Sequence, residues 1–284
     1  MKLTKALAKL HQQAKDLVFS DKQLTEDDKF FILENYHEAG NSNNAVAGAF
    51  FTPVGLASDL HITNSIDDGK IIDLCAGIGR LAYFFRNENC WGDRNNQIVC
   101  VELNSEYVEV GKRILPEATW INASIFDVDY TQFGQFDMAI SNPPFGRIKT
   151  ADNFKGKYKG AEFEFKCLEL ASQIATYGAF ILPCESSPFQ YINRVYQSEA
   201  GRKYKKFQKE ADFNYWGDSC SIDASFYQDD WKGVKPACEV VSFEFLEDKE
   251  SSIDDTQHQD ESDMDHIILP CHVEQKESAQ MSLF

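Results

Sequence analysis

The stretch that decides the fold runs Phe136-Asp137-Met138-Ala139-Ile140-Ser141-Asn142-Pro143-Pro144-Phe145-Gly146. Met138 to Ile140 is short, apolar and partly β-branched, which is typical of a buried strand, and a pair of prolines ends it at once. Asn142 precedes a proline, so its backbone is pushed toward an extended conformation and away from helix. The stretch therefore predicts a strand that delivers a rigid loop to the carboxyl edge of a sheet.

This loop has the groups needed to hold an external amine. The amide oxygen of Asn142 and a proline carbonyl are both acceptors, and Phe145 adds a flat apolar face beside them. Accepting the hydrogens of an exocyclic amine pulls its nitrogen toward sp³ geometry and frees the lone pair, while an aromatic ring holds a base that has left its stack. The alternative is a strand followed by a structural Pro-Pro turn, so the rest of the chain must decide.

Composition and charge limit the classes of protein that fit. The chain has 284 residues, of which 43% are hydrophobic, enough to bury one substantial core. The net charge of −17 argues at first against nucleic acid, but residues 247–284 alone hold eleven acidic residues and two lysines. Elsewhere two basic clusters stand out, each also compatible with a solvated helix face, and we expect both to contact phosphates. They are Arg147, Lys149, Lys155, Lys157 and Lys159, and the aromatic-containing run with Arg202, Lys203, Lys205, Lys206 and Lys209.

The sequence shows no sign of export or membrane insertion. The N-terminal residues lack the continuous apolar core of a signal peptide, and no stretch is long enough to span a bilayer. The eight cysteines are scattered without a Cys-x-x-Cys pair, which favours reduced thiols over a disulfide framework or a zinc site. We therefore expect a cytoplasmic protein with no membrane partner and no metal.

Apolar periodicity and turn residues divide the chain into alternating strands and helices. Strands are expected at 70–74, 97–101, 119–122, 136–141, 178–182 and 239–246. Helices are expected at 3–18, 25–40 (with a capping-box pattern at Thr25 and Asp28), 53–61, 80–87, 105–115, 163–176 and 189–209. This alternation predicts an α/β, Rossmann-like, doubly wound and mostly parallel sheet preceded by an N-terminal helical pair. We expect a helical segment over 1–44, a catalytic domain over 45–246 and a disordered acidic tail over 247–284.

Two glycines mark the turn from the first strand into the next helix. Glycine at 77 and 79 permits a tight turn and lets a ligand approach the backbone closely. Gly77 to Ala82 also fits the looser dinucleotide fingerprint, with Glu102 near the place of a ribose-binding carboxylate, so a nicotinamide enzyme remains open. A different adenosine ligand is favoured by Asp73, which suits a cationic amine, and by the lack of a clear second substrate domain.

Four motifs taken together resemble a known family. They are Phe51-Thr52-Pro53, Asp73-Leu74-Cys75-Ala76-Gly77-Ile78-Gly79, Val101-Glu102-Leu103-Asn104 and Asn142-Pro143-Pro144-Phe145. Over about residues 45–185, their order and rough spacing resemble those of S-adenosylmethionine-dependent adenine-N6 DNA methyltransferases of the gamma group, which includes the modification subunits of type I restriction systems. The resemblance implies a seven-stranded methyltransferase sheet, S-adenosylmethionine as cofactor, and methyl transfer to the N6 amine of a flipped adenine in DNA.

The resemblance also implies a cofactor site. Phe51, Thr52 and Pro53 would close over the amino-acid end of the cofactor. Its methionine and sugar would be lined by Asp73, Ala76, Gly77 and Gly79, and its ribose bound by Glu102 with Leu103 beside it. The family commonly has an Asp and a bulky apolar residue that contact the cofactor's adenine. The best match here is Ser124 with Ile125, a departure because Ser124 carries no charge.

For the target amine, the resemblance implies roles in the Pro-Pro loop. Asn142, which also adjoins the cofactor, and Pro143 would accept from the amine, while Pro144 completes the catalytic loop. Phe145 would stack on the flipped base.

Several other functions stay open or are set aside. A cytosine carbon-5 enzyme needs a Pro-Cys nucleophile after the fourth strand, but Pro183-Cys184 follows the fifth, so Cys184 is interpreted as structural. RNA-adenine and protein-glutamine methyltransferases share Asn-Pro-Pro loops and remain rivals, because glutamine also presents a planar amide nitrogen. A non-catalytic cofactor-binding adaptor subunit is the alternative from another class, and an intact Asn142 to Phe145 motif argues against it.

The C-terminal part of the chain suggests partners. The segment 184–238 is small for a target-recognition domain, so specificity is either short or supplied by a separate subunit. Gln280, Leu283 and Phe284 at the end of the acidic tail resemble the peptide by which bacterial replication proteins bind the sliding clamp. An extended tail can place two apolar side chains in a preformed pocket while a disordered linker gives reach, although a frayed apolar terminus is the alternative.

Overall fold

The computed structural model describes most of the chain up to residue 245. The described residues are 3–38, 50–86, 95–148, 153–213, 215–216 (backbone only), 222–232 and 234–245. They belong to one compact unit, Met1–Glu247. The acidic tail, the basic residue Lys149 and the C-terminal Gln280, Leu283 and Phe284 lie outside the described residues.

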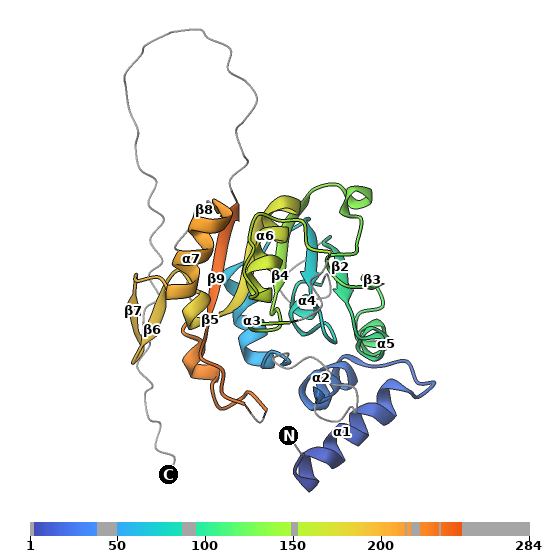
Figure 1. The fold of residues 1–284 in the computed structure, drawn as a ribbon. Helices are drawn as coiled ribbons and strands as arrows, with labels where there is room; N and C mark the ends of the chain where they lie inside the picture. The colour runs from blue at the N-terminus through green and yellow to red at the C-terminus, as the bar shows by residue number, and fades with distance from the viewer. Residues whose placement is uncertain are drawn as a thin grey trace, which may run out of the picture. The chain divides into compact units, whose positions relative to one another are not determined.

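One central sheet organises this unit (Figure 1). Across the sheet the strand order is β3 (Thr119–Asn122), β2 (Gln97–Glu102), β1 (Lys70–Leu74), β4 (Phe136–Ser141), β5 (Ala175–Pro183), β9 (Cys238–Phe245) and the two-residue β8 (Tyr215–Trp216). Strands β1 to β5 are mutually parallel, whereas β9 runs antiparallel to β5 and β8 antiparallel to β9. The predicted α/β, doubly wound and mostly parallel fold is confirmed.

Both faces of the sheet are covered by helices (Figure 1). Successive strand side chains point to opposite faces, so Ile71 packs into one core and Ile72 into the other. The first core holds α1 (Lys5–Val18), α2 (Glu26–Asn35), α3 (Val54–Thr63), α4 (Arg80–Phe84) and α5 (Ser105–Ile114). The second holds α6 (Phe163–Ile174) and α7 (Arg202–Ala211). Burial on both faces explains why the parallel strands are almost continuously apolar.

The N-terminal helical pair is present and packs next to α5 (Figure 1). The capping box predicted for α2 is formed, because the Thr25 side chain accepts from the Asp28 amide while Asp28 accepts from the Thr25 amide. Tyr36 at the end of α2 donates to Glu106 of α5 over 2.8 Å. The helix ends at Asn35, five residues before the glycine expected to end it.

The predicted helix over 189–209 is wrong in its first half. Residues 190–197 form a hairpin of β6 (Gln190–Ile192) and β7 (Val195–Gln197), and α7 begins only at Arg202. The turn residues Asn193 and Arg194 have φ of 51° and 65°, which no right-handed helix can contain. β-Branched and aromatic residues on both sides favour strands, whereas the basic amphipathic pattern that indicated helix is confined to α7.

Short elements complete the described part of the chain. They are the 3₁₀ turns η2 (Tyr130–Phe133), η3 (Cys184–Ser186) and η4 (Ala224–Tyr227). None of the helices in the described ranges combines the length and apolar character needed to cross a bilayer.

Candidate active site

The site lies where the strand order reverses. β2 and β4 flank β1 on opposite sides, and Asp73 of β1 is in register with Ile140 of β4. Because the two strands are parallel, the turn after β1 and the Pro-Pro loop after β4 emerge side by side at the same carboxyl edge. This reversal point is where open α/β sheets bind ligands.

A single pocket joins these two strand ends. Its lining includes Phe51, Thr52, Asp73, Ala76, Gly77 and Asn142, all of which the sequence analysis selected. The pocket is narrow, about 30 Å³, because the Phe51 ring lies against the glycine turn. A Cβ added to Gly77, whose φ is +57°, would be only 3.0 Å from a Phe51 ring carbon. An adenosine-sized ligand therefore requires the Phe51 ring to move.

The Phe51 ring is held from two sides. It meets the ring of Tyr107 edge-on at 5.0 Å between centroids, and the Arg80 guanidinium lies 5.1 Å from its centroid. Arg80 is buried and donates to the Thr52 carbonyl over 2.9 Å, while burial lowers its pKa to about 10. Arg80, which the sequence analysis passed over, thus fixes the backbone of the Phe51–Pro53 motif.

Glu102 connects the ends of β1 and β2. Its two carboxylate oxygens accept from the Gly77 amide over 2.8 Å and from the Asn104 amide over 2.7 Å. Burial raises the pKa of Glu102, and the two backbone hydrogen bonds oppose that rise. A carboxylate oxygen has more than one lone pair, so Glu102 keeps acceptor capacity for two ligand hydroxyls.

In the part of the chain that the structure describes, the buried Asp73 carboxylate lacks a hydrogen-bond donor for one of its oxygens. One oxygen accepts from the Ala82 amide over 3.3 Å, while the other, Oδ1, is buried without a hydrogen-bond partner among the described residues. Burial raises the pKa of Asp73 well above its usual range, and the nearby charge of Glu102 adds to the rise. A cationic amine brought by a ligand would supply the missing donor and reverse that shift.

Asn142 presents one free acceptor. Its amide nitrogen donates to the Phe50 carbonyl over 2.8 Å and to the Thr52 hydroxyl over 3.0 Å. The carbonyl partner fixes the orientation of the amide, since only the nitrogen end can donate to it. In the described part of the chain, the Asn142 oxygen has no donor, so the side chain keeps an acceptor for an external amine.

Two side chains that the sequence analysis missed brace the Pro-Pro loop. Ser141 donates to the Leu74 carbonyl and so ties the end of β4 to that of β1. Glu164 of α6 is fully buried and accepts from the Gly146 amide over 2.8 Å and from the Ser186 hydroxyl over 2.9 Å. The only sequence signal for Glu164 is an acidic residue between two phenylalanines.

Other selected residues lie outside the pocket but along the same strand edge. Pro53 precedes α3, and Gly79, with φ +85°, begins α4 beside the Trp120 ring. Leu103 is 50% exposed. After β3, the Ser124 hydroxyl accepts from the Phe126 amide over 3.3 Å, and Ile125 is buried in the second core. The order Gly77, Glu102, Ser124 therefore follows β1, β2 and β3 outward.

The basic residues selected from the sequence are mostly exposed. Arg147 and Lys157 are exposed, as are Arg202, Lys205 and Lys206 of α7, while Lys203 is half-buried. Lys205 and Lys206 form surface ion pairs with Glu199 (3.0 Å) and Glu210 (3.6 Å). Such exposed pairs are weak and exchange readily for other anions.

Comparison with known proteins agrees with this geometry. Residues 55–155 match the family described as Methyltransferase small domain. Among curated proteins, no sequence matches this chain. A solved modification subunit of a putative type I restriction enzyme from Vibrio vulnificus is 14% identical with a TM-score of 0.54, covering 78% of this chain and 50% of its own. A putative class I S-adenosylmethionine-dependent methyltransferase from Listeria monocytogenes is 12% identical with a TM-score of 0.55, covering 87% and 82%.

A third similar structure is the methyltransferase subunit of a type I restriction-modification system from Streptococcus thermophilus. It is 15% identical with a TM-score of 0.51, covering 78% of this chain and 49% of its own, so this chain spans about half the length of both type I subunits. The matched domain and the class I fold support a methyltransferase whose cofactor is S-adenosylmethionine. The unpartnered Asp73 oxygen and the acceptor capacity of Glu102 fit its ammonium group and its ribose hydroxyls.

Proposed function

We propose that this protein methylates the N6 amine of adenine in DNA, using a base that has left the helical stack. One observation carries the proposal. Asn142, directly after the strand β4 that neighbours β1, uses both amide hydrogens on Phe50 and Thr52 and keeps its oxygen as an acceptor. An acceptor in that place can draw the hydrogens of a planar amine toward itself.

The residues that would hold the cofactor follow the strand edge. Asp73 would bind its ammonium group, Glu102 its ribose hydroxyls, and Ser124 with Ile125 would lie near its adenine. Bound S-adenosylmethionine supplies an electrophilic methyl group. In this proposal the Phe51–Pro53 segment closes over the amino-acid end, which requires the Phe51 ring to leave Gly77.

The Pro-Pro loop would prepare the acceptor amine. The Asn142 oxygen and the Pro143 carbonyl accept its two hydrogens, which pulls the nitrogen toward sp³ geometry and exposes its lone pair. Pro143 and Pro144 keep the loop rigid, so these acceptors need no rearrangement when the base arrives. Phe145, only partly buried, provides a ring on which the extruded adenine can stack.

Contacts to the DNA backbone are proposed for two groups of basic residues. They are Arg147, Lys149 and Lys157 after the Pro-Pro loop, and Arg202, Lys203, Lys205 and Lys206 on α7. Local clusters of this kind attract phosphates even when the whole chain is acidic.

Labelled S-adenosylmethionine incubated with separate DNA, RNA and protein pools tests the proposal, with nucleoside analysis of the products. N6-methyladenine in DNA, lost in Asn142→Ala and kept in the exposed control Asn95→Ala, is the expected result. Label found only in RNA or in protein glutamine would show that RNA or protein, and not DNA, is the substrate. Label in none of the pools, with the cofactor still bound, would favour the adaptor subunit.

Two partners complete the proposal. The type I restriction-modification subunits of similar fold, and the small size of segment 184–238, support a separate specificity subunit. The terminal pattern of Gln280, Leu283 and Phe284 supports docking on the bacterial sliding clamp. Purified clamp should be retained by the full chain and not by one lacking residues 280–284, and equal retention would end this part of the proposal.

A further inference from the structure

The segment between Ser187 and Gly201 contains the two-stranded β6–β7 sheet. Its ends are joined because the Gly201 amide donates to the Ser187 carbonyl over 2.8 Å. The first strand of the β6–β7 hairpin is also tied to β9, since the Tyr191 amide donates to the buried Glu239 over 2.8 Å. The hairpin is therefore a fixed projection from the main sheet.

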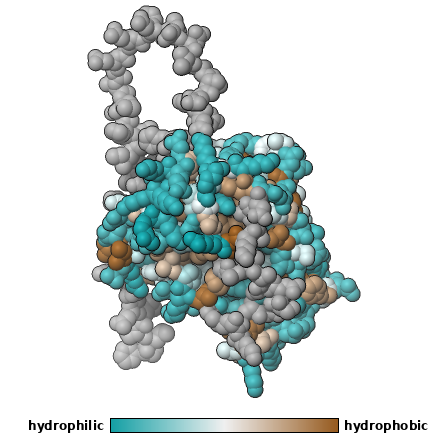
Figure 2. Space-filling view, viewed as in Figure 1, coloured by the Kyte–Doolittle hydropathy of each residue, from teal (hydrophilic) through white to brown (hydrophobic). Residues whose placement is uncertain are grey.

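The hairpin has two different faces. On one face the cross-strand pair Tyr191 and Tyr196 packs against Phe189, edge-on for Tyr191 (6.2 Å between ring centroids) and tilted for Tyr196 (5.4 Å). On the other face the pairs are Gln190 with Gln197, and Ile192 with Val195. Ile192 and Val195 are 54% and 57% exposed. In Figure 2 a hydrophobic patch lies on the surface over this hairpin, at the left of the view.

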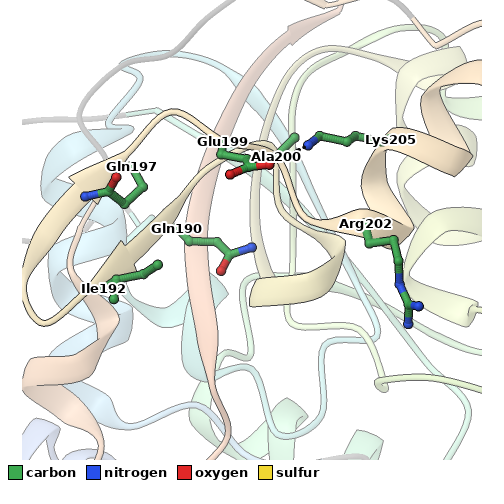
Figure 3. A pocket seen from close by; sticks show the side chains of 7 residues that line it. All are labelled: Gln190, Ile192, Gln197, Glu199, Ala200, Arg202 and Lys205. Carbon is green, nitrogen blue, oxygen red and sulfur yellow. Dashed lines mark hydrogen bonds and ion pairs between the residues drawn. The ribbon is translucent and has the colours of Figure 1, made fainter.

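A pocket of about 410 Å³ separates this face from the start of α7 (Figure 3). Gln190, Ile192 and Gln197 line it from the hairpin, and Arg202 and Lys205 from the helix. The Gln190 amide points across the pocket toward the α7 side (Figure 3). The pocket thus combines amides, aliphatic groups and cations with one carboxylate, Glu199, which pairs with Lys205 over 3.0 Å.

The helix beside the pocket is strongly basic. α7 buries Tyr204, Phe207 and Ala211 in the second core and turns its charged residues outward. These are Arg202, Lys203, Lys205, Lys206 and Lys209, against the single acid Glu210. Figure 2 shows hydrophilic side chains covering this region. In a chain with a net charge of −17, such a concentration indicates a polyanionic partner.

The surface is also tied to the Pro-Pro loop. Ser186, just before the segment 187–201, donates to Glu164, and the other oxygen of Glu164 accepts from the Gly146 amide. Because β4 and β5 are parallel neighbours, the loop after β4 and the segment after β5 leave the same edge of the sheet. The hairpin therefore has a fixed position relative to Asn142.

We propose that the hairpin face and α7 together read the sequence of duplex DNA next to the target adenine. A two-stranded ribbon fits the major groove, where glutamine amides pair with the edge of adenine and aliphatic groups contact the thymine methyl. Gln190, Gln197, Ile192 and Val195 read base edges, while Arg202, Lys203, Lys205 and Lys206 contact phosphates. This proposal rests on DNA being the substrate, and it assigns the bases next to the adenine to this chain, so that a separate specificity subunit would read only bases farther away.

The test for base reading compares the double variant Gln190→Ala/Gln197→Ala with Gln135→Ala, an exposed glutamine just before β4 at the opposite edge of the sheet. Each protein methylates duplexes with randomised bases around the adenine, and the modified sequences are read out. Wild type and control should share one preference. The double variant should lose about ten-fold or more on the best sequence and little on the others. An unchanged preference would overturn base reading by the hairpin.

The test for phosphate contact measures duplex binding against salt. Lys205→Gln/Lys206→Gln should bind all sequences more weakly and show a smaller salt dependence, with Lys5→Gln/Lys9→Gln in α1 as the like-charge control. Equal binding by wild type and variant would overturn the role of α7. The two proposals fail separately. Absence of DNA methylation by the wild type would contradict the proposed reaction. Methylation by the wild type, with sequence preference and duplex binding unchanged in the variants, would contradict only the role proposed for this surface.

Discussion

The ends of β1 and β4 lie next to each other but are built for opposite purposes. At the end of β1, the buried Asp73 and the half-buried Glu102 lie around a turn with positive φ at Cys75, Gly77 and Gly79, and one Asp73 oxygen lacks a donor among the described residues. After β4, the Asn142 amide nitrogen and the Gly146 amide are hydrogen-bonded, and the Asn142 oxygen has no donor among the described residues. The end of β1 therefore suits a cationic ligand that carries hydroxyl groups, and the loop after β4 suits a neutral amine. A cofactor and a substrate can therefore be selected independently at one sheet edge.

The largest expected effect comes from removing the acceptor at β4. Asn142→Ala should lower the rate of methyl transfer by roughly 100- to 1,000-fold or more, because the amine keeps its planar geometry. Cofactor affinity should stay within a few-fold of wild type, since Asp73 and Glu102 are untouched. Calorimetry with S-adenosylmethionine and single-turnover methylation measure the two quantities. Activity that survives would contradict the division between the two strand ends.

The converse change removes the carboxylate at the end of β1. Asp73→Asn should weaken S-adenosylmethionine binding by about 10- to 100-fold, the range for losing a hydrogen bond to a charged group. Because burial raises the pKa of Asp73, wild-type affinity should increase as the pH rises through that pKa, and the variant should lose this dependence. Binding titrations at a series of pH values above the usual carboxyl range measure it, with the exposed Asp21→Asn as control. A variant with wild-type affinity would remove Asp73 from the site.

A smaller effect is expected from the brace of the Pro-Pro loop. Glu164→Ala removes the acceptor for Gly146 and Ser186 and should lower kcat by about ten-fold with little change in cofactor KM. Glu164→Gln should restore most of the activity, because its oxygen can accept from Gly146 and its nitrogen can donate to Ser186. Steady-state kinetics of both variants make the comparison. Equal losses in the two variants would show that charge, not positioning, matters.

The smallest expected effect concerns the stability contribution of Glu239, a buried acid that lies apart from Asp73. Burial raises the pKa of Glu239 to about 7, so its ionisation costs stability progressively as the pH rises from about 4.5 to about 7. Glu239→Gln should therefore raise the Tm by a few degrees at pH 8 and leave it unchanged at pH 4. S-Adenosylmethionine should not alter this difference, because Glu239 lies under the hairpin and not in the Asp73 pocket. Scanning calorimetry at both pH values provides the measurement.

Local signals made the sheet and the pocket predictable. Short apolar strands ended by glycine or proline located β1 and β4, and parallel neighbours necessarily bring such ends together. The β6–β7 hairpin was missed because its turn, Asn193-Arg194, lacks glycine, and because the basic pattern of α7 extends the apparent helix backward. The roles of Glu164 and Glu239 depend on partners up to 55 residues away in sequence, and Phe51 contacts the distant Gly77, so no local pattern could reveal them.

The central claim is that the cofactor and the target amine meet in one pocket between the Gly77 turn and the Pro-Pro loop. The most direct test is a crystal structure of the protein with S-adenosylhomocysteine, the demethylated cofactor. The sulfur should lie between the Gly77 turn and the Asn142 oxygen, with the Phe51 ring displaced from Gly77 and the ligand ammonium on Asp73. A ligand bound elsewhere, with Phe51 still packed on Gly77, would contradict the account.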